Sequence, residues 1–145
     1  MTDTGPTRHI SWAELACHDA QRTPYPQNWR NDRAVTLGLT FEEIRRLLGN
    51  EPIRITSGYR TPAYNSTLEG AASNSQHVQG RAVDIQHPTL SARDVFMAVR
   101  AAQAAGALVM LGGLGLYATF VHVDVRPKLS GRLALWAGRG LELQT

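Results

Sequence analysis

The sequence predicts an α+β fold, with a small antiparallel sheet that has helices on one face and leaves the opposite face open. Short runs enriched in β-branched residues alternate with longer segments of helical periodicity, and Gly, Pro and Asn separate them. With 145 residues, 43% of them apolar, the chain is long enough to form one real core. We therefore expect a single domain over residues 1–145, without internal repeats.

The expected helices begin at residues that cap helix N-termini. Ser11 is followed by Glu14 in the position of a capping-box partner, and Ser91 precedes a segment with apolar residues on one face. Glycine follows the second and third segments, where it favours a helix stop. Three segments share these features: residues 12–17, 33–48 and 91–105.

The expected strands are short and rich in Val, Ile and Leu. We interpret residues 127–131 as a hairpin connection, which would make the last three strands antiparallel. A polar loop over residues 58–80 separates the first two strands, and loops of this length inside a compact domain are usually functional. The five strands are expected at residues 53–57, 82–85, 114–117, 120–126 and 132–136.

Charge and composition exclude several classes of protein. The net charge of +3 comes from scattered basic residues, so we expect no nucleic-acid partner. No apolar run approaches the ~20 residues of a membrane span, and the start of the chain shows no signal peptide. The single cysteine, Cys17, excludes an internal disulfide and a cysteine-based zinc cage. The oligomeric state has no signal in the sequence.

Two motifs carry the residue types of a zinc site with an open position. His77 lies in a polar stretch containing Gly80, and Asp84 follows within an apolar, strand-like run. His122 and Asp124 lie two residues apart in a second such run, so on a strand both face the same side. Catalytic zinc sites use three protein ligands and leave one position to water.

The same residues have a simpler interpretation, because a lone buried His or Asp is usually a hydrogen-bonded core group. The coincidence of two motifs favours a metal, and a buried carboxylate needs a positive partner. Either His122 or Asp124 could be the third ligand. We favour His122, because imidazole is the commoner neutral zinc ligand and Asp84 already supplies a negative charge.

These motifs resemble a known family. The run from Ser75 to Asp84, Ser-x-His-x-x-Gly-x-Ala-x-Asp, followed by a strand with His-x-Asp, is similar to the zinc D-alanyl-D-alanine metallopeptidases. These are the VanY-like peptidoglycan peptidases, which share a core with lysostaphin-type enzymes and the hedgehog domain. The resemblance runs from His9 to Arg126 and includes the segments at residues 55–62 and 113–117.

The resemblance implies roles for six residues. It makes His77, Asp84 and His122 the ligands of one Zn²⁺ per chain, and it makes a peptidoglycan stem peptide the partner. Arg60 matches the position that receives the substrate carboxylate, and a guanidinium suits that task because it binds carboxylates bidentately. Ser75 and Gln76 lie beside the metal motif and are expected to hydrogen-bond the same peptide.

One departure concerns the general base. Many family members carry a carboxylate three residues before the last histidine, where this chain has Thr119. Asp124 is the nearest carboxylate and is our predicted catalytic residue. It could take the proton of the zinc-bound water, or accept a hydrogen bond from a ligand histidine.

The donor residues predict metal-dependent hydrolysis. The resemblance implies that the enzyme is a zinc peptidase that hydrolyses a peptide bond next to a D-amino acid, as a carboxypeptidase or an endopeptidase. The alternatives are a zinc-bearing module that binds wall peptides without cutting them, and a virion component. Without a visible signal peptide, we expect synthesis in the cytoplasm and action on the wall after lysis, as a phage lysin, or within a virion.

Overall fold

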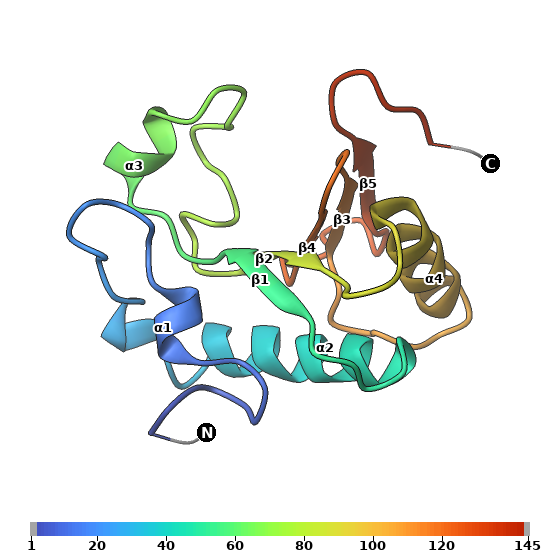
Figure 1. Ribbon diagram of the computed structural model, residues 1–145, viewed down its shortest axis with the longest axis horizontal. Helices are drawn as coiled ribbons and strands as arrows, with labels where there is room; N and C mark the ends of the chain where they lie inside the picture. Colours follow the sequence, from blue (N-terminus) through green and yellow to red (C-terminus); the bar gives the residue numbers. More distant parts are fainter. Residues whose placement is uncertain (1–2, 144–145) are drawn as a thin grey trace.

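The computed structural model describes residues 3–143; the ends of the predicted domain, residues 1–2 and 144–145, lie outside them. Helices and a mixed five-stranded sheet form an α+β fold, which confirms the predicted class (Figure 1). No helix in the described part is long and apolar enough to span a membrane. The helices are α1 (Trp12–Leu15), α2 (Arg33–Leu47), α3 (Pro62–Ser66) and α4 (Ala92–Ala104), with a 3₁₀ turn at Gln27–Trp29.

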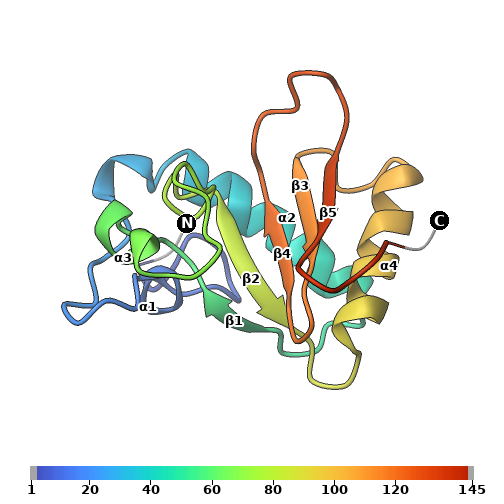
Figure 2. The ribbon, with the colours of Figure 1, turned by 90° about the horizontal axis from the view of Figure 1, so that it is seen from above.

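The sheet has the order β1-β2-β4-β3-β5, which Figure 2 shows from above. The first four strands pair antiparallel, and β5 pairs parallel with β3. The sheet is strongly twisted, so that β1 and β3 lie at a large angle to each other in Figure 1. The strands are β1 (Arg54–Ser57), β2 (Ala82–Gln86), β3 (Gly113–Leu116), β4 (Val121–Asp124) and β5 (Ala134–Ala137).

The prediction that β5 is antiparallel in a hairpin with β4 is wrong. Both edges of β4 are already paired, one with β2 and the other with β3. The chain after β4 therefore passes to the free edge of β3 and pairs there. Because it runs opposite to β4, it runs parallel to β3. This arrangement places Trp136 of β5 beside Gly115 of β3.

Side chains alternate between two faces of the sheet, and one face is purely apolar. Val83 and Ile85 of β2, with Val121 and Val123 of β4, are at most 1% exposed and belong to the main core. Helices α2 and α4 cover this face with residues such as Phe41, Ile44, Phe96 and Val99. The opposite face carries the polar residues of β2 and β4.

The short helix α3 was not predicted, because its residues lie inside the polar segment that we interpreted as one long loop. Its start has a clear signal, since the side chain of Thr61 accepts a hydrogen bond from the Tyr64 N–H and Pro62 occupies the first turn. Figure 1 shows α3 on the opposite side of the sheet from α2. It therefore stands on the same side as the polar residues.

Candidate metal centre

Strands β2 and β4 place two of the predicted ligands directly opposite each other. Asp84 of β2 is the register partner of His122 of β4, and both side chains leave the face opposite to the valine core. Nδ1 of His122 lies 3.3 Å from Oδ1 of Asp84. The alternation of the two strands and their register are therefore sufficient to bring these two donors together.

The third predicted ligand, His77, comes from the loop before β2. Its Nε2 lies 3.1 Å from the same Asp84 oxygen, and its Nδ1–H donates to the carbonyl of Gly58 at 2.8 Å. The loop turns at Gly80, whose φ of +70° favours glycine, and the hydroxyl of Tyr25 donates to the Gly80 carbonyl at 2.6 Å. These contacts hold the histidine against the sheet.

The group formed by His77, Asp84 and His122 fits a metal ion. One donor atom from each lies within 4.8 Å of the others, and the three residues are 3%, 4% and 7% exposed. The far N–H of each imidazole is used elsewhere, so in the neutral rings the lone pairs face the Asp84 carboxylate. Three converging acceptors of this kind can share a cation, and zinc accepts a set of two His nitrogens and one Asp oxygen.

The pKa values of the three groups reflect their mutual contacts. Burial alone would raise the pKa of Asp84, but His77 and His122 outweigh it and hold that pKa well below its usual range. Burial lowers the pKa of His77, although Asp84 opposes the shift. Burial would also lower the pKa of His122, but hydrogen bonds to Asp124 and Asp84 raise it above its ordinary value.

Asp124 lies behind His122, away from Asp84. Its Oδ2 accepts the Nε2–H of His122 at 2.7 Å, and the guanidinium of Arg126 donates to both carboxylate oxygens at 2.9 and 2.7 Å. The side chain is fully buried. Burial would raise its pKa, but the bonds from His122 and Arg126 outweigh it and hold the pKa at about 2. The structure thus places Asp124 where it can fix the ring of His122.

Arg60 lies on the other side of the donor group. Its Nη2 is 3.4 Å from Oδ2 of Asp84, the oxygen that does not face the histidines. Its Nε donates to the Ser57 hydroxyl at 3.2 Å and its Nη1 to Oδ1 of Asn65 at 3.3 Å. The side chain is 15% exposed, so part of it remains accessible beside the site.

Ser75 and Gln76 precede His77 directly. The Ser75 hydroxyl accepts the backbone N–H of His77 at 3.2 Å, which ties it to the shape of this loop. Oε1 of Gln76 is buried without a hydrogen-bond partner in the described structure. Both residues therefore lie next to a predicted ligand, and their contact with substrate stays a prediction.

Trp136 is a site neighbour that sequence analysis missed. The centroid of its ring lies 5.0 Å from that of the His122 ring, and Cζ of Arg126 lies 5.1 Å from the centroid of the Trp136 ring. Two glycines in the segment at residues 113–117 are the sequence feature that could have indicated a large side chain packed beside this strand. A Cβ at Gly115 would come 2.5 Å from the Trp136 ring, and one at Gly113 would overlap the Asp124 carboxylate. The two glycines make room for these side chains.

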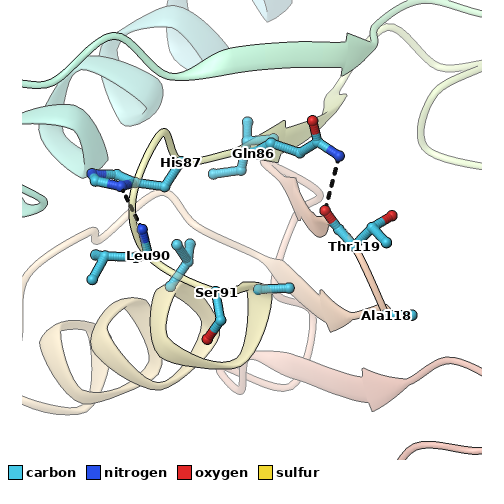
Figure 3. Close-up of a pocket in the computed structure, with 9 residues that line it drawn as sticks. Gln86, His87, Leu90, Ser91, Ala118 and Thr119 are labelled. Atoms are coloured by element: carbon cyan, nitrogen blue, oxygen red, sulfur yellow. Dashed lines mark hydrogen bonds between the residues drawn. The ribbon is translucent and has the colours of Figure 1, made fainter.

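Thr119 lies in the lining of a different cavity, of about 270 Å³, which contains none of the three donors. Figure 3 shows this cavity between the end of β2, the β3–β4 turn and the start of α4. Nε2 of Gln86 donates to the Thr119 carbonyl at 2.9 Å, and Nδ1 of His87 accepts the Leu90 N–H at 3.1 Å. These two hydrogen bonds connect the strand, turn and loop segments that line the cavity.

Comparison with known proteins agrees with this geometry. A sequence model of the family described as Peptidase M15 matches residues 8–124, a range that contains all three donors and Arg60. A search of curated proteins gave no match. Because the matched range covers most of the 145 residues, the chain belongs to the peptidase M15 family of D-Ala-D-Ala carboxypeptidase-like zinc peptidases.

Proposed function

We propose that this M15 metallopeptidase hydrolyses a peptide bond next to a D-amino acid in the stem peptides of peptidoglycan. The observation that carries the proposal is the convergence of His77, Asp84 and His122 on one point at the face of the sheet that the main helices leave open. The family membership supports a peptide substrate. The D-amino acid and the wall peptide follow from the resemblance of the motifs.

We assign one zinc ion per chain to the three donors. When bound, zinc polarises a carbonyl and makes a water acidic enough to attack it near neutral pH. His77 and His122 contribute neutral nitrogens, and Asp84 contributes a carboxylate that stays ionised because its pKa is lowered. Each histidine keeps its far N–H on a fixed acceptor, which sets the tautomer that leaves the other nitrogen free for metal.

Asp124 is better suited to hold His122 than to act as the general base of our prediction. Its oxygens are engaged by His122 and Arg126, and its side chain has no exposure to a substrate. A pKa of about 2 also makes it a weak proton acceptor at neutral pH. We therefore propose that Asp124 keeps a proton on Nε2 of His122 and directs Nδ1 toward the metal.

Arg60 is proposed to bind the carboxylate of the substrate. Asn65 and Ser57 fix its guanidinium beside Asp84, and the remaining N–H groups can form charge-assisted bonds to an incoming carboxylate. Ser75 and Gln76 flank His77 and are proposed to hydrogen-bond the peptide near the metal.

Digestion of purified peptidoglycan tests this function. We expect mass analysis to show stem peptides cleaved at a bond next to a D-amino acid, with the activity abolished by a chelator and restored by zinc. The His77→Ala variant is the matched inactive control. Intact peptidoglycan after incubation with zinc-loaded protein, across a range of pH, would overturn the proposal.

A second candidate is a zinc-bearing module that binds wall peptides without cutting them. This function is favoured because Asp124, the residue predicted to be the general base, is buried and hydrogen-bonded to Arg126. In that position it is poorly placed to support hydrolysis. Tight binding of a stem peptide to the zinc-loaded protein with no cleavage would identify this function.

We also propose release at lysis, as a phage lysin, or incorporation into a virion; finding the chain in purified particles would distinguish these two routes.

A further inference from the structure

A cavity of about 510 Å³ adjoins the candidate metal centre on the side of His122. Glu69 and Gly70 line it from the loop after α3, Tyr117 lines it from the β3–β4 turn, and residues 136–139 line it from the end of β5. Trp136 belongs both to this cavity and to the surroundings of His122, 5.0 Å from the histidine ring. Its volume is typical of a site for a small organic group.

The aromatic wall of this cavity is held by a hydrogen bond and by ring stacking. Nε1–H of Trp136 donates to the Tyr117 hydroxyl at 2.9 Å, and the Tyr117 ring stacks on Phe120 with centroids 4.6 Å apart. Gly115 lies against the indole, where a side chain would collide with it. The two rings therefore form a preformed apolar surface on which an aliphatic chain can pack without reorganising the protein.

The rim of the cavity carries opposite charges. Glu69 and Arg139 are both exposed and both line the cavity, from segments that are distant in the sequence. Among the residues that the structure describes, no ion pair joins them. A carboxylate and a guanidinium are thus both available to a ligand that brings the complementary charges.

We propose that this cavity is a substrate subsite for a peptide side chain that ends in both an ammonium and a carboxylate, as a diamino dicarboxylic acid residue does. Trp136 and Tyr117 would pack against the aliphatic stem, Glu69 would pair with the ammonium, and Arg139 would bind the carboxylate. The inference rests on the proposed function for its substrate class. It adds which stem peptides the enzyme selects.

Two stem peptides that differ only in one side chain test the subsite: one carries meso-diaminopimelate and the other carries lysine at the same position. We expect the zinc-loaded protein to cleave the diaminopimelate peptide with a kcat/KM about 10-fold higher, the size of one charged hydrogen bond. Arg139→Gln should remove this preference by slowing only the diaminopimelate peptide. Glu69→Gln should slow both peptides by similar factors.

The controls separate this inference from the proposed function. Arg132→Gln removes another exposed arginine outside the cavity and should leave both rates unchanged, and the zinc content of every variant should match that of the wild type. Equal rates for the two peptides, or an Arg139→Gln variant that keeps the preference, would overturn the subsite. If neither peptide is cleaved, calorimetry measures how tightly each of the two peptides binds. Tighter binding of the diaminopimelate peptide that is lost in Arg139→Gln supports the subsite, although the proposed hydrolysis fails. Equal binding of the two peptides, or no binding, overturns the subsite.

Discussion

The two histidines of the candidate metal centre are held in opposite ways. His77, in a loop, donates its far N–H to the neutral carbonyl of Gly58, whereas His122, on a strand, donates its far N–H to the carboxylate of Asp124. The pKa of His77 is lowered because burial dominates, and the pKa of His122 is raised because two carboxylates outweigh burial. The imidazole of His77 is therefore oriented by a main-chain carbonyl, and that of His122 by a charged side chain.

This difference indicates which support of the site single substitutions can remove. The support of His77 belongs to the backbone, and no side-chain substitution removes the carbonyl of Gly58. The support of His122 is a network of Asp124 and Arg126, which single substitutions can remove in steps. We therefore expect substitutions around His122 to lower zinc affinity in steps. Around His77, we expect substitutions to act mainly by destabilising the fold of the loop.

The largest effect should come from removing either ligand, and it should be the same on both sides. We expect His77→Ala and His122→Ala each to reduce zinc from about one ion per chain to nearly none, because only two protein ligands remain. Elemental analysis after dialysis measures this, with His18→Ala as the control, since His18 is an exposed histidine outside the donor group. Retained zinc in either ligand variant would show that the group is not the metal site.

Asp124→Asn changes the support of His122 and leaves that of His77 intact. The asparagine can still accept the His122 N–H but carries no charge, so we expect zinc affinity to fall by about 10- to 100-fold, as when partners behind metal ligands are lost. Competition with a chelator of known affinity measures the change. Complete loss of zinc would instead mean that Asp124 is itself a ligand and that His122 has the supporting role.

Acid should unfold the metal-free protein partly through Asp124. Its folded pKa of about 2 lies below the ordinary value of 3.8, so its ionised form stabilises the fold above about pH 4, and this contribution is lost as the pH falls toward 2. The shift corresponds to about 2 kcal/mol. Urea unfolding at pH 6 and pH 3 should show a smaller loss of stability for Asp124→Asn than for the wild type; equal losses would contradict this.

The smallest effect on zinc should come from Tyr25→Phe, which acts on the loop side. It removes the hydroxyl that donates to the Gly80 carbonyl and should lower the free energy of unfolding by about 1 kcal/mol. His77 keeps its bond to Gly58, so zinc affinity should change little. Parallel unfolding and chelator titrations test this, and a large loss of affinity would show that the loop depends on this single hydrogen bond.

Much of the fold follows from local patterns. The helix predicted at 33–48 is observed at Arg33–Leu47, and the strand predicted at 82–85 is observed at Ala82–Gln86. Caps, apolar periodicity and glycine stops act within a few residues, so the sequence displays them directly. The parallel pairing of β5 is not local, because it depends on which strand edges remain free after β2, β3 and β4 have paired.

The candidate metal centre shows the same division between local patterns and tertiary structure. By itself the sequence determined the chemistry of the donors and, through the two-residue period of a strand, that His122 and Asp124 face the same side. Only the tertiary structure distinguishes their positions, because the register of β2 on β4 pairs Asp84 with His122 and leaves Asp124 opposite Ala82. A register shifted by two residues would keep every side chain on its face and place Asp124 instead of His122 opposite Asp84, since alternation specifies the face and only the pairing of the strands specifies the neighbour.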